Sequence, residues 1–441
     1  MEKYFNSTIP EITYEMLNPD FWIRHSETSS RIIGCYDKIE SFNNKSMSDN
    51  HIKDVFDLKI QYTKNEVKDI ILSISVPIKK EMYRNGLKLK EEDIKKLETN
   101  LDIDKILYNS VVKYGMITYR TVVKSYPTDD KLFDNEEEYI IDRLMESAIN
   151  ICEPVLVFHE SYDKEWYFIQ SYNCKGWVRK KYLAIGSKKD IEEYAKSKDF
   201  LIVTGRRIYT NYNPIDKRTA LIPIDMGVKL RLVEKNSIPN EVDDMDVLAS
   251  YVIYLPVRNE KDGNLELVKT LIPRCADVNI GFLYYTEENI IKQSFKFLGE
   301  RYGWGGDFFS RDCSSLVLDV LKTMGIYMPR NTSKQSEENL GIVKKMNDLQ
   351  MNQKKKFLDW LHPGSILYMK GHVMIYLGKY NEEYYVIHDT IGFYVSSICK
   401  TKTGDLKYIK ANGVTLTPMS IAYTTSGQNY INALIASKIF I

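Results

Sequence analysis

Short β-rich runs separated by turn residues fill the chain between residues 109 and 280, and this pattern limits the folds that the chain can adopt. The clearest runs are 116–123, 154–159, 165–169, 175–178, 200–204, 228–233, 251–256 and 265–268. Strands this short bury their apolar faces by closing into small barrels or by stacking as two sheets. The segment therefore predicts two small β-barrels, at residues 109–195 and 196–280.

The flanking segments have different patterns. Residues 1–108 contain charged, helix-favouring stretches such as 90–99, without catalytic signals, which predicts a helical N-terminal packing domain. Residues 281–441 begin with helical periodicity after a candidate N-cap at Thr286 and continue as strands. The chain is therefore expected to be a multidomain α+β protein whose last domain carries a mostly antiparallel sheet.

Charge and hydropathy exclude several classes of protein. The 61 basic and 60 acidic residues of the 441 nearly cancel and form no basic block, which argues against nucleic acid or an anionic membrane as the main partner. No apolar run is long enough to span a membrane, and the first residues lack a signal-peptide core. We expect a cytoplasmic protein as written, or one of the cell envelope or outside if a leader was removed. Its oligomeric state is open, and a monomer is expected.

The six cysteines are scattered and include no CxxC pair, which indicates reduced thiols rather than a disulfide framework. One of them, Cys313, follows the glycine-rich stretch 302–306 and begins an apolar-periodic helix. A helix N-terminus carries partial positive charge that stabilises a thiolate. The position therefore predicts a cysteine activated as a nucleophile.

Two later histidines are the candidate base and orienting group. His372 and His388 each belong to a predicted strand, and pairing of these strands would bring both rings toward Cys313. A third histidine, His362, sits in a Pro-Gly turn and is expected to be exposed. A buried structural cysteine with two core histidines fits the same spacing. A zinc site is the other alternative, but no CxxC, HxH or HExxH spacing supports it, and no metal or cofactor is expected.

The sequence motifs around these residues resemble those of the NlpC/P60 family of cysteine peptidases. This resemblance favours a catalytic cysteine over a buried structural cysteine or a zinc site. The matching stretches occur in the family's order: 302–306, 312–314, 328–332 with Gln335, 363–364, 371–373 and 387–388. Upstream, Phe21-Trp22 with 39–43 resembles a helical clip domain, and 165–167 with 176–178 resembles a bacterial SH3 domain. The resemblance implies domains at 1–108 (clip), 109–195 and 196–280 (SH3-like) and 281–441 (papain-like NlpC/P60 peptidase).

The resemblance also implies an activity and roles for single residues. Related proteins cleave the bond between γ-D-glutamate and a diamino acid in cell-wall peptides. By this likeness Cys313 is the nucleophile, His372 the general base and His388 the orienting third member.

Residues around this triad are expected to bind substrate. Tyr302 would line the site near the oxyanion, Asp312 and Ser314 would meet the free amino group of L-alanine, and Thr332 would add a polar contact. Two stretches depart from the family pattern: Ser315 stands where glycine is common, and Asn331-Thr332 where Asp-Ser is common.

The first barrel is expected to wall off one end of the site through its acidic insertion, 129–138, with Tyr139 as a candidate wall residue. Substrates would then be released stem peptides with a free L-alanine rather than intact peptidoglycan. Two alternatives remain: an N-acetylmuramoyl-L-alanine amidase on the same scaffold, and a non-catalytic wall-binding protein. Whether the third stem residue is diaminopimelate or lysine is left open.

Overall fold

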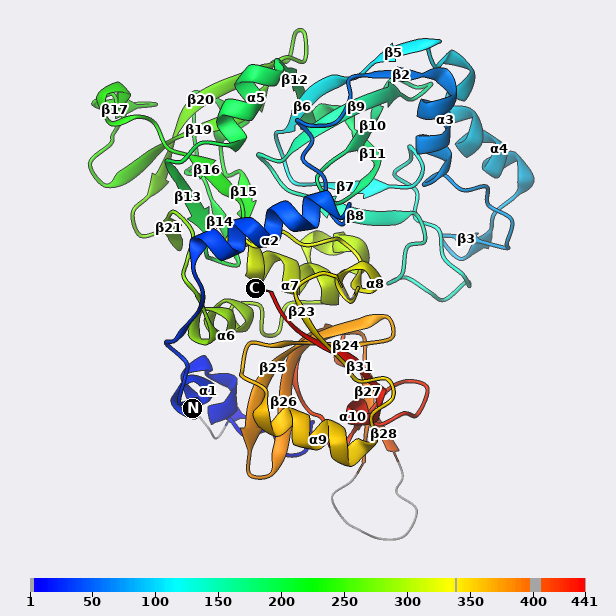
Figure 1. The fold of residues 1–441 in the computed structure, drawn as a ribbon. Helices are drawn as coiled ribbons and strands as arrows, with labels where there is room; N and C mark the ends of the chain where they lie inside the picture. The colour runs from blue at the N-terminus through cyan, green and yellow to red at the C-terminus, as the bar shows by residue number, and fades with distance from the viewer. Residues whose placement is uncertain (1–3, 338, 397–405, 441) are drawn as a thin grey trace. The chain divides into compact units, whose positions relative to one another are not determined.

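A computed structural model describes residues 4–337, 339–396 and 406–440 of the chain (Figure 1). Its contacts divide into two compact units. Unit 1 comprises Met1–His51, Leu283–Gly303 and Phe308–Ile441, and unit 2 comprises Ile52–Phe282 and Trp304–Asp307. The predicted multidomain α+β architecture is confirmed.

The first 108 residues are shared between the two units, since residues 1–51 belong to unit 1 and residues 52–108 to unit 2. The finer division of the chain into four domains therefore stays a prediction.

Unit 2 is built mainly from antiparallel strands. Its helices and strands are β2 (Gln61–Thr63), α3 (Lys64–Leu72), β3 (Tyr83–Arg84), β4 (Leu87–Lys88), α4 (Glu91–Asn100), β5 (Asn109–Val111), β6 (Lys113–Ile117), β7 (Thr121–Lys124), β8 (Met145–Ile149), β9 (Pro154–Glu160), β10 (Trp166–Gln170), β11 (Lys175–Arg179), β12 (Leu183–Gly186), α5 (Lys188–Ala195), β13 (Phe200–Val203), β14 (Arg207–Tyr209), β15 (Pro223–Asp225), β16 (Lys229–Arg231), β17 (Glu241–Val242), β18 (Met245–Asp246), β19 (Ser250–Arg258), β20 (Leu265–Pro273) and β21 (Val278–Ile280).

Seven of these strands form one antiparallel sheet in the order β12-β6-β9-β10-β11-β7-β8. Its core contains Trp166 and Trp177, whose side chains are almost completely buried. The indole N–H of Trp177 donates to Ser75 Oγ at 3.1 Å, so the buried polar atom is satisfied. The following segment contributes a three-stranded sheet, β16-β13-β21, and the hairpins β14-β15 and β19-β20. Both segments are all-β at their centre, as the short runs predict.

Unit 1 combines helices with a larger sheet. Its helices and strands are α1 (Pro19–Arg24), β1 (Ile32–Gly34), α2 (Tyr36–Ser48), β22 (Tyr285–Thr286), α6 (Glu287–Phe295), α7 (Cys313–Lys322), α8 (Thr332–Gln335), β23 (Ile342–Lys345), α9 (Met351–Trp360), β24 (Ile366–Met369), β25 (His372–Tyr380), β26 (Glu383–Thr390), β27 (Phe393–Ser396), β28 (Leu406–Ile409), β29 (Gly413–Pro418), β30 (Ala422–Tyr423), α10 (Tyr430–Ala433) and β31 (Leu434–Ile439).

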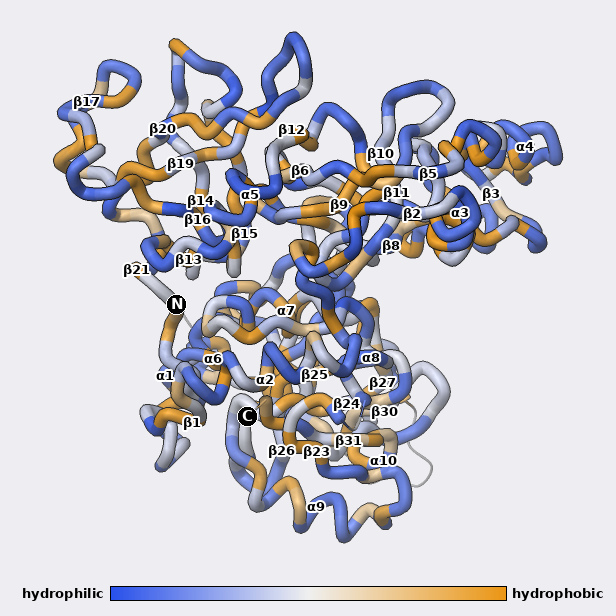
Figure 2. Tube along the Cα trace, turned by 45° about the horizontal axis from the view of Figure 1, so that its top comes forward, coloured by the Kyte–Doolittle hydropathy of each residue, from blue (hydrophilic) through white to orange (hydrophobic). Residues whose placement is uncertain are grey.

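Six of these strands form an antiparallel sheet in the order β23-β31-β24-β25-β26-β29. Helix α7 packs against β25 and β26, because its apolar residues recur at helical spacing and are buried. Helix α9, in contrast, is mostly hydrophilic (Figure 2). The predicted order of helices followed by an antiparallel sheet is thus observed.

The five cysteines that the structure describes are all free thiols, while Cys399 lies outside the described residues. Across the described parts of the chain, every helix is too short or too polar to cross a lipid bilayer.

Candidate active site

The helix that carries Cys313 begins with a well-formed cap. The carboxylate of Asp312 accepts the backbone N–H of Ser315 at 2.9 Å, and the backbone N–H of Asp312 donates to Ser315 Oγ at 2.9 Å. This reciprocal pair satisfies two backbone donors that a helix start otherwise leaves free. Ser315, which stands where glycine is common in the related sequences, therefore helps to cap the start of this helix.

The thiol of Cys313 is buried beside two hydrogen-bonding groups. Its Sγ lies 3.8 Å from Oγ1 of Thr332, and the backbone N–H of Val373 also contacts it. Burial and, to a smaller extent, the charge of Asp312 raise the pKa of Cys313, these two hydrogen bonds oppose the rise, and the resulting pKa is about 12. The predicted stabilisation of a thiolate by the helix start is therefore outweighed by desolvation, and the resting group is a neutral thiol.

Three side chains on neighbouring strands form a hydrogen-bonded row. Nε2 of His372, at the start of β25, lies 2.7 Å from Nδ1 of His388 on β26. Nε2 of His388 lies 2.8 Å from Oγ1 of Thr417 on β29. The sequence predicts the pairing of the two histidines but not Thr417, since one threonine in a β-rich stretch carries no signal of its own.

Both imidazoles are held in the neutral form. Burial lowers the pKa of His372 to about 4. Burial, and then the neighbouring charge of His372, lowers the pKa of His388 well below its ordinary value. Because a neutral imidazole has one donor and one acceptor nitrogen, each hydrogen bond in the row constrains the tautomer of the next ring.

Asp312 has a strong partner that the sequence analysis did not identify. The guanidinium of Arg330 donates to both carboxylate oxygens, at 2.7 Å to Oδ2 and 3.2 Å to Oδ1, and to Ser314 Oγ at 2.8 Å. Despite desolvation by burial, which acts in the opposite direction, the Arg330 charge and hydrogen bonds hold the pKa of Asp312 below its usual range. Arg330 belongs to the stretch 328–332, which resembles the family sequence. That resemblance was the signal in the sequence that could have pointed to Arg330 as a site residue.

Tyr302 lies at the start of the loop that leads to Cys313. Its backbone N–H donates to Asn412 O at 3.0 Å. Burial raises the pKa of its hydroxyl far above the ordinary value, and the nearby Cys313 and Asp312 act in the same direction. Tyr302, Asp312, Ser314, Thr332 and the three proposed catalytic residues all belong to unit 1.

A further acidic residue, Asp389, also lies close to the thiol. It follows His388 on β26, is fully buried, and neither of its carboxylate oxygens has a hydrogen-bond partner among the described residues. Burial raises its pKa well above the ordinary value, and the charges of Asp312 and Glu300 add to the rise. Sequence reasoning missed this residue because its environment depends on the strand pairing.

Tyr139 and the acidic insertion belong to unit 2, so the structure does not place them relative to Cys313. Tyr139 is about half exposed. Three acidic residues of the insertion form ion pairs: Asp129 with Arg179, Asp130 with Arg84, and Asp134 with Lys80 and Arg143. All of these ion-pair partners lie in unit 2, as does the insertion itself.

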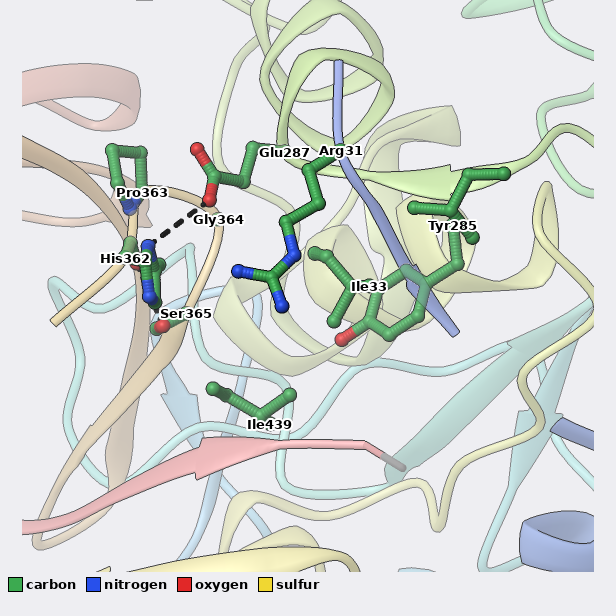
Figure 3. A pocket seen from close by; sticks show the side chains of 10 residues that line it. Arg31, Ile33, Tyr285, Glu287, His362, Pro363, Gly364, Ser365 and Ile439 are labelled. Atoms are coloured by element: carbon green, nitrogen blue, oxygen red, sulfur yellow. Dashed lines mark hydrogen bonds and ion pairs between the residues drawn. The ribbon is translucent and has the colours of Figure 1, made fainter. Parts of the chain in front are cut away.

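His362 lies apart from the other two histidines and lines a separate cavity of about 190 Å³ in unit 1 (Figure 3). Its Nδ1 lies 3.3 Å from Oε1 of the buried Glu287. The side chain is about half exposed, in agreement with the predicted turn position. In the described part of the chain, no three His, Cys, Asp or Glu side chains gather as metal ligands.

Two protein-family models match separate parts of the chain. A model of the NlpC/P60 family matches residues 299–434, and a model of the SH3 domain of SH3b1 type matches residues 131–179. No curated protein matches the sequence.

Among solved structures, an NlpC/P60 endopeptidase from Photobacterium damselae subsp. piscicida aligns over 99% of both chains with a TM-score of 0.76 and 19% identity. An NlpC/P60 family protein from Bacillus cereus aligns over 74% of this chain and 99% of its own, with a TM-score of 0.47 and 16% identity. The first likeness shows a shared fold, and the two family models identify residues 299–434 as an NlpC/P60 family domain and residues 131–179 as an SH3b1-type SH3 domain.

Proposed function

We propose that the protein is a cysteine peptidase that hydrolyses the bond between γ-D-glutamate and a diamino acid in bacterial cell-wall peptides. The observation that carries this proposal is the hydrogen-bonded row His372–His388–Thr417, whose two histidines lie on strands β25 and β26 that pack against the helix beginning at Cys313. The NlpC/P60 family consists typically of cell-wall peptidases, and the matched domain contains all four residues.

The hydrogen-bonded row supports one assignment of the protons. If His372 is the base, its Nδ1 must accept the thiol proton, because its Nε2 is engaged with His388. Nε2–H of His372 then donates to Nδ1 of His388, and Nε2–H of His388 donates to Thr417 Oγ1. His388 acts as the orienting group, and the hydroxyl of Thr417 accepts its Nε2–H and holds its ring in place.

The reaction begins from the neutral thiol and imidazole. His372 removes the proton of Cys313 as the sulfur attacks the γ-glutamyl carbonyl, and the backbone N–H of Cys313 and the hydroxyl of Tyr302 stabilise the oxyanion. The C–N bond breaks as the imidazolium of His372 protonates the leaving amine. Water, deprotonated by the same ring, then hydrolyses the thioester and regenerates the thiol.

The same site can select the amino end of its substrate. Asp312, Ser314 and Thr332 surround the nucleophile and provide polar atoms for the α-ammonium group of a free L-alanine. Since Arg330 already neutralises Asp312, we propose that this carboxylate contributes a shared, directional hydrogen bond rather than a lone charge. The acidic insertion and Tyr139 are proposed to limit the substrate to released stem peptides.

Product analysis on defined substrates tests the proposal. The protein is incubated with L-Ala-γ-D-Glu-diaminopimelate, its lysine analogue and intact peptidoglycan, and products are identified by mass spectrometry. The proposal expects L-Ala-D-Glu and the free diamino acid from the peptide, with slower release from intact wall. Cleavage between muramic acid and L-alanine would instead identify an amidase.

Cys313→Ala provides the matched inactive variant, with Cys35→Ala as a control at an exposed free cysteine. Loss of cleavage is expected only in Cys313→Ala, with little change in melting temperature. Cleavage at the normal rate by Cys313→Ala would end the proposal.

A further inference from the structure

The loop between Tyr302 and Cys313 is closed at its base inside unit 1. Tyr302 and Arg311 pair as a parallel bridge, and the backbone N–H of Gly303 donates to Arg311 O at 2.6 Å. The guanidinium of Arg311 is buried and pairs with Glu300 at 2.8 Å and with Asp319 at 2.7 Å. The two ends of the loop are therefore held together immediately before the nucleophile.

The tip of the same loop, Trp304–Asp307, belongs to unit 2. Nη2 of Arg120 donates to the carbonyl oxygen of Gly306 at 3.0 Å, and Nε of Arg120 pairs with Asp225 Oδ2 at 2.8 Å. Both side chains of this ion pair are almost fully buried. A further ion pair joins Lys131 to Asp307. Arg120 lies between β6 and β7, while Asp225 ends β15, so both barrel-forming segments contribute to the contact.

Glycine is required at the tip for two reasons. Gly306 has φ +90°, and a Cβ built on it would lie 2.5 Å from the Cβ of Ala148 on β8. Gly305 has φ +63°, and its Cβ would lie 3.0 Å from the Cβ of Met145. Phe308 and Phe309, which follow, also have positive φ values. Such a backbone persists only where surrounding contacts hold it.

We propose that Arg120, oriented by Asp225, is a positioning residue that holds Gly306 and through this loop sets the geometry of Tyr302 and Cys313. The planar guanidinium suits the task because one fork serves a carboxylate and a carbonyl oxygen at the same time. The inference rests on the proposed peptidase function, because it gives two residues of unit 2, Arg120 and Asp225, a part in positioning the proposed nucleophile.

A compensating pair of substitutions tests the positioning without removing a buried charge. Gly306→Ala places a methyl group 2.5 Å from the Cβ of Ala148, and Ala148→Gly in the same chain removes this shortest contact. Gly281→Ala is the matched control, because Gly281 has φ +72° with no atom within 4 Å of its Cβ position. Two quantities are measured: kcat and KM on the stem tripeptide, and the rate of iodoacetamide labelling at Cys313 at pH 9, followed by peptide mass spectrometry.

The proposal expects kcat of Gly306→Ala to fall at least tenfold with a smaller change in KM, and the labelling rate of Cys313 to change at least threefold. Ala148→Gly should recover at least threefold of the lost kcat, while Gly281→Ala stays within twofold of the parent. Gly306→Ala indistinguishable from Gly281→Ala in both readouts would overturn it. Loss without recovery in the double variant would also overturn it, because the effect would then be local backbone strain.

Arg120→Lys tests the side chain itself, since a single ammonium group cannot reproduce both contacts of the fork. We expect a lower kcat and an altered labelling rate in a folded protein; a lower melting temperature with both rates unchanged would reduce Arg120 to a structural role and overturn the proposal. If the parent protein cleaves no stem peptide while labelling at Cys313 still responds to Gly306→Ala and recovers, the positioning stands and the proposed substrate is wrong.

Discussion

Nε2 of His372 and Nδ1 of His388 lie 2.7 Å apart, so the two histidines form one hydrogen-bonded pair. A ring that uses Nε2 toward its neighbour has only Nδ1 left for a thiol, so the contact determines which nitrogen of His372 can act as base. His388 can serve this purpose only as an acceptor at Nδ1, which requires its proton on Nε2, next to Thr417 Oγ1. In the proposed mechanism, the orientation of His372 thus depends on Thr417, which lies two hydrogen bonds from the ring of His372.

The two histidines are expected to differ in their contribution to turnover. Replacing His372 with alanine removes the base and should lower kcat by about 10²–10⁴-fold. His388→Ala leaves the base in place but unoriented, so its kcat should fall less. Steady-state kinetics on the stem tripeptide measures both, and a greater loss in His388→Ala would show that the two roles are exchanged.

Thr417→Val should lower kcat about tenfold with little change in KM, because Nε2–H of His388 loses its hydrogen-bond acceptor and the ring is held less firmly. The control is Thr415→Val. Thr415 lies opposite His388 in the strand register, but its hydroxyl donates to Leu416 O at 3.3 Å instead of contacting the ring. Equal effects of the two substitutions on kcat would argue against a role of Thr417 in orienting His388.

The buried thiol predicts an unusual pH dependence of alkylation. With the pKa of Cys313 raised to about 12, the thiolate fraction should increase tenfold for each pH unit between 7 and 10. Iodoacetamide labelling, quantified at Cys313 by peptide mass spectrometry, should follow the same slope, with the exposed Cys35 and Cys275 as internal references. A labelling rate that is already at its plateau near pH 7 would show that the helix start stabilises the thiolate after all.

The sequence predicted the residues of local motifs, but it did not predict the contacts between distant segments. Cys313 at a helix start and the two strand histidines were readable because helix caps and strand alternation are local patterns. Thr417, Arg330 and Asp389 acquire their environments from strand register and from packing of distant segments, which local patterns do not encode. The same reason explains why the raised pKa of Cys313 was not foreseen: the helix start is local, whereas burial is a property of the folded domain.

Arg330→Met should destabilise the protein by about 3–5 kcal/mol at neutral pH, because it leaves the buried Asp312 carboxylate without its cation. The pKa of Asp312 is lowered in the folded protein, so the stability it contributes is present above its unfolded pKa and is lost as pH falls through the folded value. The difference from the parent should therefore shrink toward pH 3 in denaturant titrations. Arg24→Met, at an exposed arginine of α1, is the control. A pH-independent difference would mean that Arg330 acts through packing alone.

Asp389→Asn should have the opposite effect on stability: it should stabilise the protein, increasingly so as the pH rises. Because the folded pKa of Asp389 is raised, the native state keeps a proton that the unfolded chain releases near pH 4, and the free energy of unfolding falls as pH rises. Over that window each pH unit costs the parent about 1.4 kcal/mol, a cost that asparagine does not incur. The stability advantage of Asp389→Asn should therefore grow from pH 4 upward until the folded pKa is reached, as measured by urea unfolding at several pH values. Asp348→Asn, at an exposed aspartate, should show no such trend. A stability advantage that stays constant with pH would mean that a proton donor or a cation stabilises the Asp389 carboxylate in its buried site. The carboxyl group of Asp389 would then be charged rather than neutral.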